Sequence, residues 1–130
     1  MAAFSNYFED AITGWINGTT FPTAPSNLYV TLYNGDPTDA GTGGTALFTR
    51  VAIASGGWTR GTGGAGTVSN TAQILITSSA GSSGTASHVA VWDASTSGNL
   101  VFHGALASSL SINSGDEVRF NAGALQLTVA

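Results

Sequence analysis

Two histidines are the residues of this sequence with the most versatile chemistry, and they fall on neighbouring predicted strands. His88 begins one predicted strand and His103 lies within the next, so the two imidazoles can come close together. A zinc site needs at least three protein ligands. Asp93 lies at an odd offset from His88, which places the two side chains on opposite faces of one strand. We therefore expect two strand histidines that bond to the backbone or to solvent, and no metal site.

The carboxylates are a second set of residues with chemical potential, and nearly all of them fall at predicted turns. Asp side chains at turns accept hydrogen bonds from nearby backbone N–H groups. Glycosidase chemistry needs two acids facing one cleft, and a calcium loop of the EF-hand type needs a terminal Glu that is missing here. Turn capping is therefore the expected role of Asp36, Asp39, Asp93, Asp116 and Glu117.

Glycine-rich segments and serines offer no catalytic pattern either. The segments 41–44 and 61–66 resemble phosphate-binding loops, but no predicted helix follows them and the chain has no Lys. There is no G-x-S-x-G motif for a serine nucleophile. We expect no catalytic residue, no cofactor and no metal ligand, and so no enzyme.

Composition points to an assembled protein. The chain of 130 residues suits one domain, and more than half of it is Gly, Ala, Ser or Thr. Only 8% of the residues are charged, against about a quarter in typical soluble domains. The net charge of −4 with three Arg argues against nucleic-acid binding, and no apolar run is long enough for a membrane span. Such a surface fits a protein that works inside an assembly.

A single amphipathic helix is predicted over residues 3–17. Phe4, Phe8, Ile12, Trp15 and Ile16 recur at spacings of three and four and form one apolar face. Asn6 and Glu9 fit a capping box, and Gly18 fits a stop signal. Residues 1–18 are therefore expected to be a helix or arm. It either plugs one end of the β domain or docks on a neighbouring subunit or another protein.

The remainder, residues 19–130, is predicted to be one β domain. Leu28–Tyr33 alternates clearly, with both of its faces populated by large side chains, which predicts a strand covered on both sides. Segments 38–45 and 61–66 are expected to be loops, 38–45 a flexible one, and 78–87 a low-complexity surface loop. Further strand-like segments are 47–54, 58–60, the region around Val68, 73–77, 88–93, 99–106, 110–112, 117–120 and 125–129.

These segments predict an all-β fold. About eight short strands with frequent turns are typical of a sandwich or barrel, and a jelly-roll-like antiparallel β-sandwich is the architecture we expect. Among the aromatic residues, Trp92 is expected in the core. Trp58, beside Gly56 and Gly57, is expected to be exposed, where it can stack on a sugar or anchor a subunit interface.

The C-terminal third carries a recognisable pattern. Residues 88–106, HVAVWDASTSGNLVFHGAL, resemble the pattern H-V-G-I-[FW]-D-A-x-x-x-G-N-L-[LV]-[FY]-x-G-x-L of small virion proteins of tailed bacteriophages. The runs INSGDEVRF (112–120), GALQL (123–127), LYVTLYNGDP (28–37) and VSNT (68–71) also fit. One departure lies at 47–60, where similar sequences often carry Tyr-Ala-Arg and this one is longer and more hydrophobic.

The resemblance implies a structural protein of the virion, made in the bacterial cytoplasm. Relatives of this kind are described as capsid decoration (cement), head-fibre or tail-fibre proteins. The first expectation is a cement protein, a homotrimer on the outer capsid surface that binds the major capsid protein through apolar and backbone contacts. The alternative is a fibre module that binds a host-surface glycan. Candidate interface residues are Phe4, Phe8, Ile12, Trp15, Ile16, Tyr29, Tyr33 and Trp58.

Overall fold

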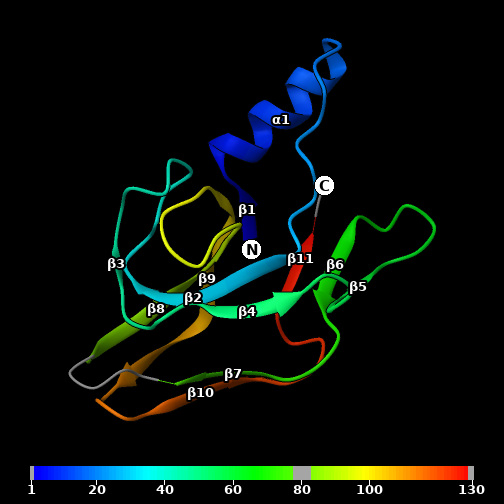
Figure 1. Ribbon diagram of the computed structural model, residues 1–130. Helices are drawn as coiled ribbons and strands as arrows, with labels where there is room; N and C mark the ends of the chain where they lie inside the picture. Colours follow the sequence, from blue (N-terminus) through cyan, green and yellow to red (C-terminus); the bar gives the residue numbers. More distant parts are fainter. Residues whose placement is uncertain (1, 78–82, 129–130) are drawn as a thin grey trace.

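The computed structural model describes residues 2–77 and 83–128, and within these ranges the chain forms one helix and eleven strands (Figure 1). The all-β prediction is confirmed, with more strands than the about eight expected from turn spacing, because several strands are only two to four residues long. The elements are β1 (Ala2–Phe4), α1 (Asn6–Ile16), β2 (Asn27–Asn34), β3 (Thr45–Ala46), β4 (Val51–Ala54), β5 (Trp58–Arg60), β6 (Thr67–Asn70), β7 (Ile74–Thr77), β8 (Gly84–Trp92), β9 (Leu100–Ile112), β10 (Glu117–Phe120) and β11 (Gln126–Thr128).

The strands form three antiparallel sheets. The largest has six strands in the order β1-β9-β8-β2-β3, with β4 also pairing with β2. A three-stranded sheet has the order β11-β6-β5, and β7 pairs with β10 in a two-stranded sheet. The main core lies between the six-stranded sheet and the two smaller ones, so the architecture is a β-sandwich; the jelly-roll assignment stays a prediction.

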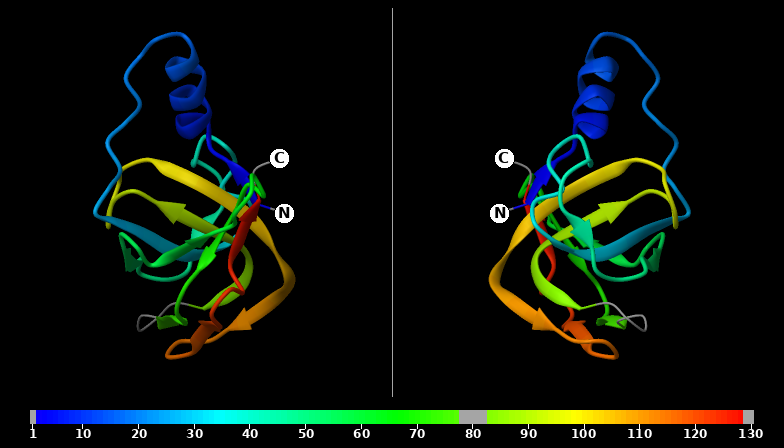
Figure 2. Two further views of the ribbon diagram at one scale, coloured as in Figure 1. Left: turned by 90° about the vertical axis from the view of Figure 1, so that its right-hand side faces the viewer. Right: turned by 90° about the vertical axis from the view of Figure 1, so that its left-hand side faces the viewer.

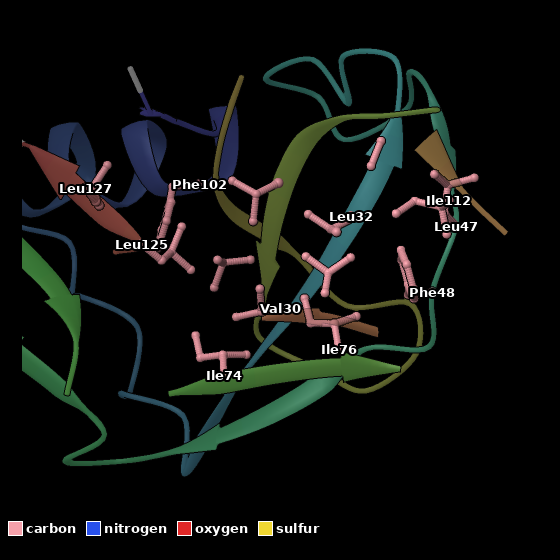
Figure 3. Close-up of a cluster of buried hydrophobic side chains, with 14 residues drawn as sticks. Val30, Leu32, Leu47, Phe48, Ile74, Ile76, Phe102, Ile112, Leu125 and Leu127 are labelled. Atoms are coloured by element: carbon pink, nitrogen blue, oxygen red, sulfur yellow. The ribbon is translucent and has the colours of Figure 1, made fainter. Parts of the chain in front are cut away.

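The core is built from inward-facing side chains of both layers (Figure 3). Val30 and Leu32 on β2 are fully buried against Ile74 and Ile76 on β7. The alternation of β2 explains this, because every second residue points to the same face of a strand. Leu47 and Phe48 join the core although the segment predicted as one strand over 47–54 is interrupted there, with β3 before and β4 after.

The opposite face of β2 is covered by the chain's own loops. Tyr33 and Trp92 belong to a second buried cluster with Ala90 and Leu100, which confirms the core position predicted for Trp92. The Arg50 guanidinium lies 4.1 Å from the centre of the Trp92 ring and donates to the carbonyl oxygens of Ala94 and Ser97, each at 2.7 Å. Burial lowers the pKa of Arg50 below its usual value, and nearby Tyr33 and Asp93 act against that shift.

Several element boundaries differ from the predicted ones. Residues 2–4 form β1 instead of the first helical turn, because they pair with Phe102–Gly104 of β9. The strands predicted at 99–106 and 110–112 are one continuous strand, β9. Of the predicted surface loop 78–87, residues 78–82 lie outside the described residues and residues 84–87 belong to β8.

The loop before β3 makes hydrogen bonds within its own backbone, and Thr45, predicted as part of the loop 38–45, belongs to β3. Its own backbone bonds join Gly41 N–H to the Thr38 carbonyl at 3.0 Å and Gly43 N–H to the Pro37 carbonyl at 2.8 Å. A Cβ atom at Gly44, where φ is +66°, would lie 2.8 Å from the Gly35 carbonyl oxygen. The glycines of this loop therefore allow close packing of its backbone.

Asn70, at the end of β6, ties two turns together. Its side-chain amide is 2% exposed, donates to the carbonyl oxygens of Ala72 at 2.8 Å and Asn121 at 3.0 Å, and accepts from Leu125 N–H at 2.9 Å. The buried amide thus fixes the turn after β6 to the segment that leads into β11.

Candidate functional site

The N-terminal helix and the segment that follows it stand apart from the β-sandwich. We call α1 and the connector 17–26 the arm. Figure 2 shows the helix projecting above the sheets in both side views, with the connector returning from its far end to β2. No residue of α1 is buried. Within the described residues, no helix is long and apolar enough to cross a membrane.

The base of the arm is fixed to the sheet by Ser5. This residue is 1% exposed, and its hydroxyl donates to the Leu100 carbonyl and accepts from Phe8 N–H at 3.3 Å. Ser5 N–H donates to the Val101 carbonyl at 3.0 Å, and Asn6 N–H donates to the Asp39 carbonyl at 2.9 Å. Ser5, and not the predicted Asn6, is therefore the N-cap, because pairing of β1 with β9 keeps the chain extended up to Phe4.

Ser5→Ala is expected to lower the free energy of unfolding by about 2 kcal/mol. The substitution removes an N-cap, typically worth about 1 kcal/mol, and leaves the buried Leu100 carbonyl without this donor, which costs about as much again. Urea unfolding of the variant measures the change, and Ser108→Ala on the exposed part of β9 is the control. Equal stabilities of the Ser5 variant and the control would contradict this role.

His103 reinforces the same junction from the loop side. Its Nε2 lies 2.8 Å from the Asp39 carboxylate and its Nδ1 lies 3.3 Å from the Asp36 carboxylate, while the imidazole itself is buried. The expectation that both histidines bond to backbone or solvent was wrong. His103 meets two carboxylates because loop 35–44 folds over β9, and His88 Nδ1 lies 2.9 Å from the Ser87 hydroxyl. His103 thus holds the loop whose Asp39 carbonyl receives the first helical N–H.

Three carboxylates cap turns as predicted, whereas Asp39 bonds to His103 and Glu117 belongs to β10. Asp36 accepts from Thr38 N–H at 2.9 Å, Asp93 from Asn99 N–H at 2.7 Å, and Asp116 from Asn113 N–H at 2.8 Å. In residues 2–77 and 83–128, no three His, Asp or Glu side chains are grouped so that they could hold a metal ion.

The far end of the arm exposes large apolar side chains. Trp15 is 64% exposed and Ile16 is 73% exposed at the last turn of α1. Ile12, one turn earlier on the same stripe, is half-buried. We call Trp15 and Ile16 the arm tip. Exposed side chains of this size next to each other mark an interaction site more often than isolated ones do.

An apolar groove of about 1080 Å³ lies between the arm and the sandwich. We call it the arm groove. Phe8 and Phe21 of the arm and Phe4 of β1 supply aromatic rings to it. The ring centres of Phe4 and Phe8 lie 4.7 Å apart, and those of Phe8 and Phe21 lie 5.6 Å apart. The other wall is the glycine-rich β5–β6 loop. The main lining residues are Phe4, Tyr7, Phe8, Phe21, Pro22, Pro25, Leu28, Arg60, Gly61–Gly64, Val68, Val101, Phe102 and Leu127.

The predicted interface residues therefore divide into separate groups. Phe4 and Phe8 meet in the arm groove, Ile12 lies along the arm, and Trp15 and Ile16 form the arm tip. Tyr33 is 8% exposed and lies within the second core cluster, against which Tyr29 packs.

Trp58 is not the exposed platform that was predicted. It is half-buried, its indole N–H is buried without a hydrogen-bond partner, and its ring meets Phe102 edge-on with centres 6.0 Å apart. Trp58 packs against the main core because β5 pairs with β6 at this point. A half-buried ring packed against the core is a poorer platform for sugar stacking than the exposed ring that was predicted.

Sequence reasoning missed the groove and its connector wall. Phe21 and Pro22 interrupt a run of small polar residues, and that contrast is the signal that could have marked them. The groove itself depends on how the connector folds back toward β2, which no local pattern encodes.

A comparison with protein-family models gives the class of protein. The model described as "Podophage GP4 fiber I protein gp80" matches residues 3–128, nearly the whole chain. The chain belongs to this family. Among curated proteins, no sequence matches it. The family is one of phage virion structural proteins, which confirms the resemblance seen in the sequence, and fibre proteins are generally structural and not enzymatic.

Proposed function

We propose that this member of the fiber I family is a fibre-type subunit on the outer surface of the virion, and that it assembles into a homotrimer. The arm carries the proposal: it has no buried residue, its base is bonded to the sheet, and its tip exposes Trp15 and Ile16. Burial of apolar surface stabilises contacts by about 25 cal/mol per Å² before the costs of association. The arm is therefore the assembly element in this proposal.

A rigid subunit of this kind suits a particle that must survive outside a cell. The low charge and the abundance of small residues allow close packing of neighbouring subunits with few charges to desolvate. The fixed arm base avoids the ordering cost that a flexible arm would pay on binding. Both features favour a structural role over a transient one.

Capsid decoration is the second candidate. A chain with only 8% charged residues can lie against the major capsid protein through apolar and backbone contacts. Binding only to the assembled lattice would stabilise that lattice by mass action. A glycan-binding role through Trp58 receives no support from its half-buried, core-packed position.

Sedimentation of the purified chain with purified particles of the phage that encodes it tests the proposal. We expect the oligomer to pellet with particles and not with host cell envelopes. A cement protein would also raise the temperature at which shells break, whereas a fibre subunit would leave it unchanged. Pelleting with envelopes alone would contradict a structural role in the virion and favour receptor binding.

Attachment to the particle is expected to depend only weakly on salt. The chain carries three Arg and seven acidic residues, so few charges are available for screening. Raising NaCl from 50 to 500 mM should change the retained fraction by less than about threefold. A loss of binding over this range would show that charge contacts dominate instead.

A further inference from the structure

The arm tip and the arm groove are complementary surfaces on every copy of the chain. The tip is an apolar projection of Trp15 and Ile16, and the groove is an apolar hollow of about 1080 Å³ with aromatic walls. Neither tip residue lines the groove. We propose that the arm tip of one copy seats in the arm groove of the next copy. This inference rests on the proposed function and names the partner of the arm.

The geometry of the arm prevents the tip from filling its own groove. The groove lies at the base of α1, where Tyr7 and Phe8 line it. Trp15 lies ten residues beyond Ser5, roughly 15 Å further along a helix that rises about 1.5 Å per residue. The bonds of Ser5 and Asn6 to β9 and loop 35–44 hold the base in place. The tip of a second copy can reach the groove without disturbing these bonds.

The exposed surface of the tip sets the size of one contact. With 64% and 73% of their side chains exposed, Trp15 and Ile16 offer roughly 300 Å² of surface, since a large aromatic side chain buries about 150–250 Å². One seated tip together with the walls it covers buries about 600 Å². A single junction of this size is small for a stable interface. In a closed ring each copy is held by two junctions, one through its tip and one through its groove. Head-to-tail contacts of this kind form rings when the rotation closes.

The charges match the same arrangement. Glu9 and Asp10 are exposed on α1, which has no basic residue. On the groove wall Arg60 is an exposed cation, and the other charged residue there, Asp93, is half-buried and accepts from the main-chain and side-chain N–H groups of Asn99. Across the described parts of the chain, no carboxylate forms an ion pair with Arg60. Glu9 lies on the same stripe of the helix as Ile12 and Ile16, at spacings of three and seven residues. A tip seated in the groove thus brings Glu9 of one copy toward Arg60 of the next.

The absence of cysteine makes a direct test possible. Asn17→Cys places one thiol next to the tip, and Thr62→Cys places one on the groove wall of a separate variant. Mild oxidation of a mixture of the two variants is expected to give a mixed disulfide dimer. A mixture of Asn17→Cys with Leu110→Cys, whose site is exposed on β9 and outside the groove, is the matched control. Equal cross-linking in the two mixtures would overturn the proposal.

Sedimentation equilibrium supplies an independent readout. The variant Trp15→Ser/Ile16→Ser is expected to begin to associate only at a concentration at least tenfold higher than the unmodified chain does. Reversing one charge, by Glu9→Arg or by Arg60→Glu, is expected to weaken association about three- to tenfold, and the double reversal to restore it. An unchanged mass of the tip variant would overturn the inference. So would a double charge reversal that associates no more strongly than the single reversals.

The outcomes separate this inference from the proposed function. A monomeric unmodified chain that pellets with particles would overturn the tip-in-groove contact and leave the virion role intact. A tip variant that keeps the oligomeric mass but no longer pellets with particles would mean that the tip binds another virion protein. That result would also overturn the tip-in-groove contact. An oligomer with the expected cross-link that ignores particles would overturn the proposed function alone.

Discussion

Replacing Trp15 and Ile16 together by Ser is expected to reduce retention of the chain on purified particles at least tenfold. Both side chains are largely exposed at the end of α1 and contribute little to the fold of one chain. In the proposed assembly they bury apolar surface at every junction, and a monomer would also lose the multivalent attachment of an oligomer. A tenfold loss corresponds to only about 1.4 kcal/mol, so it is a conservative expectation.

Two measurements make this result interpretable. At a concentration low enough for both chains to be monomeric, the thermal unfolding midpoint of the variant should stay within about 2 °C of the parent, since surface changes usually alter stability by less than about 0.5 kcal/mol. Leu75→Ser on β7 is the matched control, because Leu75 is also apolar and exposed, at 39%, but lies outside the arm. Full retention of the tip variant on particles would exclude the arm tip as an assembly element.

Asn70→Ala is expected to lower the free energy of unfolding by about 3 kcal/mol. The side-chain amide makes three hydrogen bonds in a site that is 2% exposed. Truncation leaves the Leu125 N–H and the carbonyl oxygens of Ala72 and Asn121 without this partner, and each unsatisfied buried group costs about 1–3 kcal/mol. Water can reach part of these turns, so the total loss in the free energy of unfolding is smaller than the sum of the three individual costs.

Urea unfolding monitored by tryptophan fluorescence measures the effect of Asn70→Ala. Asn121→Ala is the control, because Asn121 is exposed and contributes its main-chain carbonyl to the same network. The control should lose less than about 1 kcal/mol. Similar losses in both variants would mean that the turn sequence, and not the buried amide, determines the stability of this region.

The parts of the fold that could be predicted are those encoded by local pattern. The alternation of Leu28–Tyr33 predicted β2 and its two buried faces. The turn residues at 94–98 separated β8 from β9, and the position of Trp92 on its strand predicted its burial. The apolar spacing of residues 8–16 predicted a helix. In each case the signal lies in a short run of neighbouring residues, as an alternation, a helical spacing or a cluster of turn-forming residues.

The parts that could not be predicted depend on contacts between distant segments. Residues 2–4 are too short to show an alternation, and they become a strand only because β9 offers a free edge. Tyr33 is buried because Trp92 and Leu100, from segments far along the chain, cluster with it. Trp58 is half-buried because β5 pairs with β6 and its ring meets Phe102.

The candidate site was predictable only in part for the same reason. The helix face identified Trp15 and Ile16, but the groove arises where the connector 17–26, the β5–β6 loop and the first residues of α1 come together. The link between His103 and loop 35–44 joins residues more than sixty positions apart. Residue type and spacing alone carry no signal of such a contact.

Quantitative mass spectrometry of purified virions tests the central claim most directly. A virion structural protein must be part of the particle, in several copies per particle. Because the chain has no Lys and only three Arg, a protease that cuts at aromatic residues gives better peptide coverage than trypsin. We predict that peptides from both the arm and the β-sandwich appear in particles at a fixed ratio to the other virion proteins. Abundant protein in lysates of infected cells, with none in the purified particles, would contradict the account.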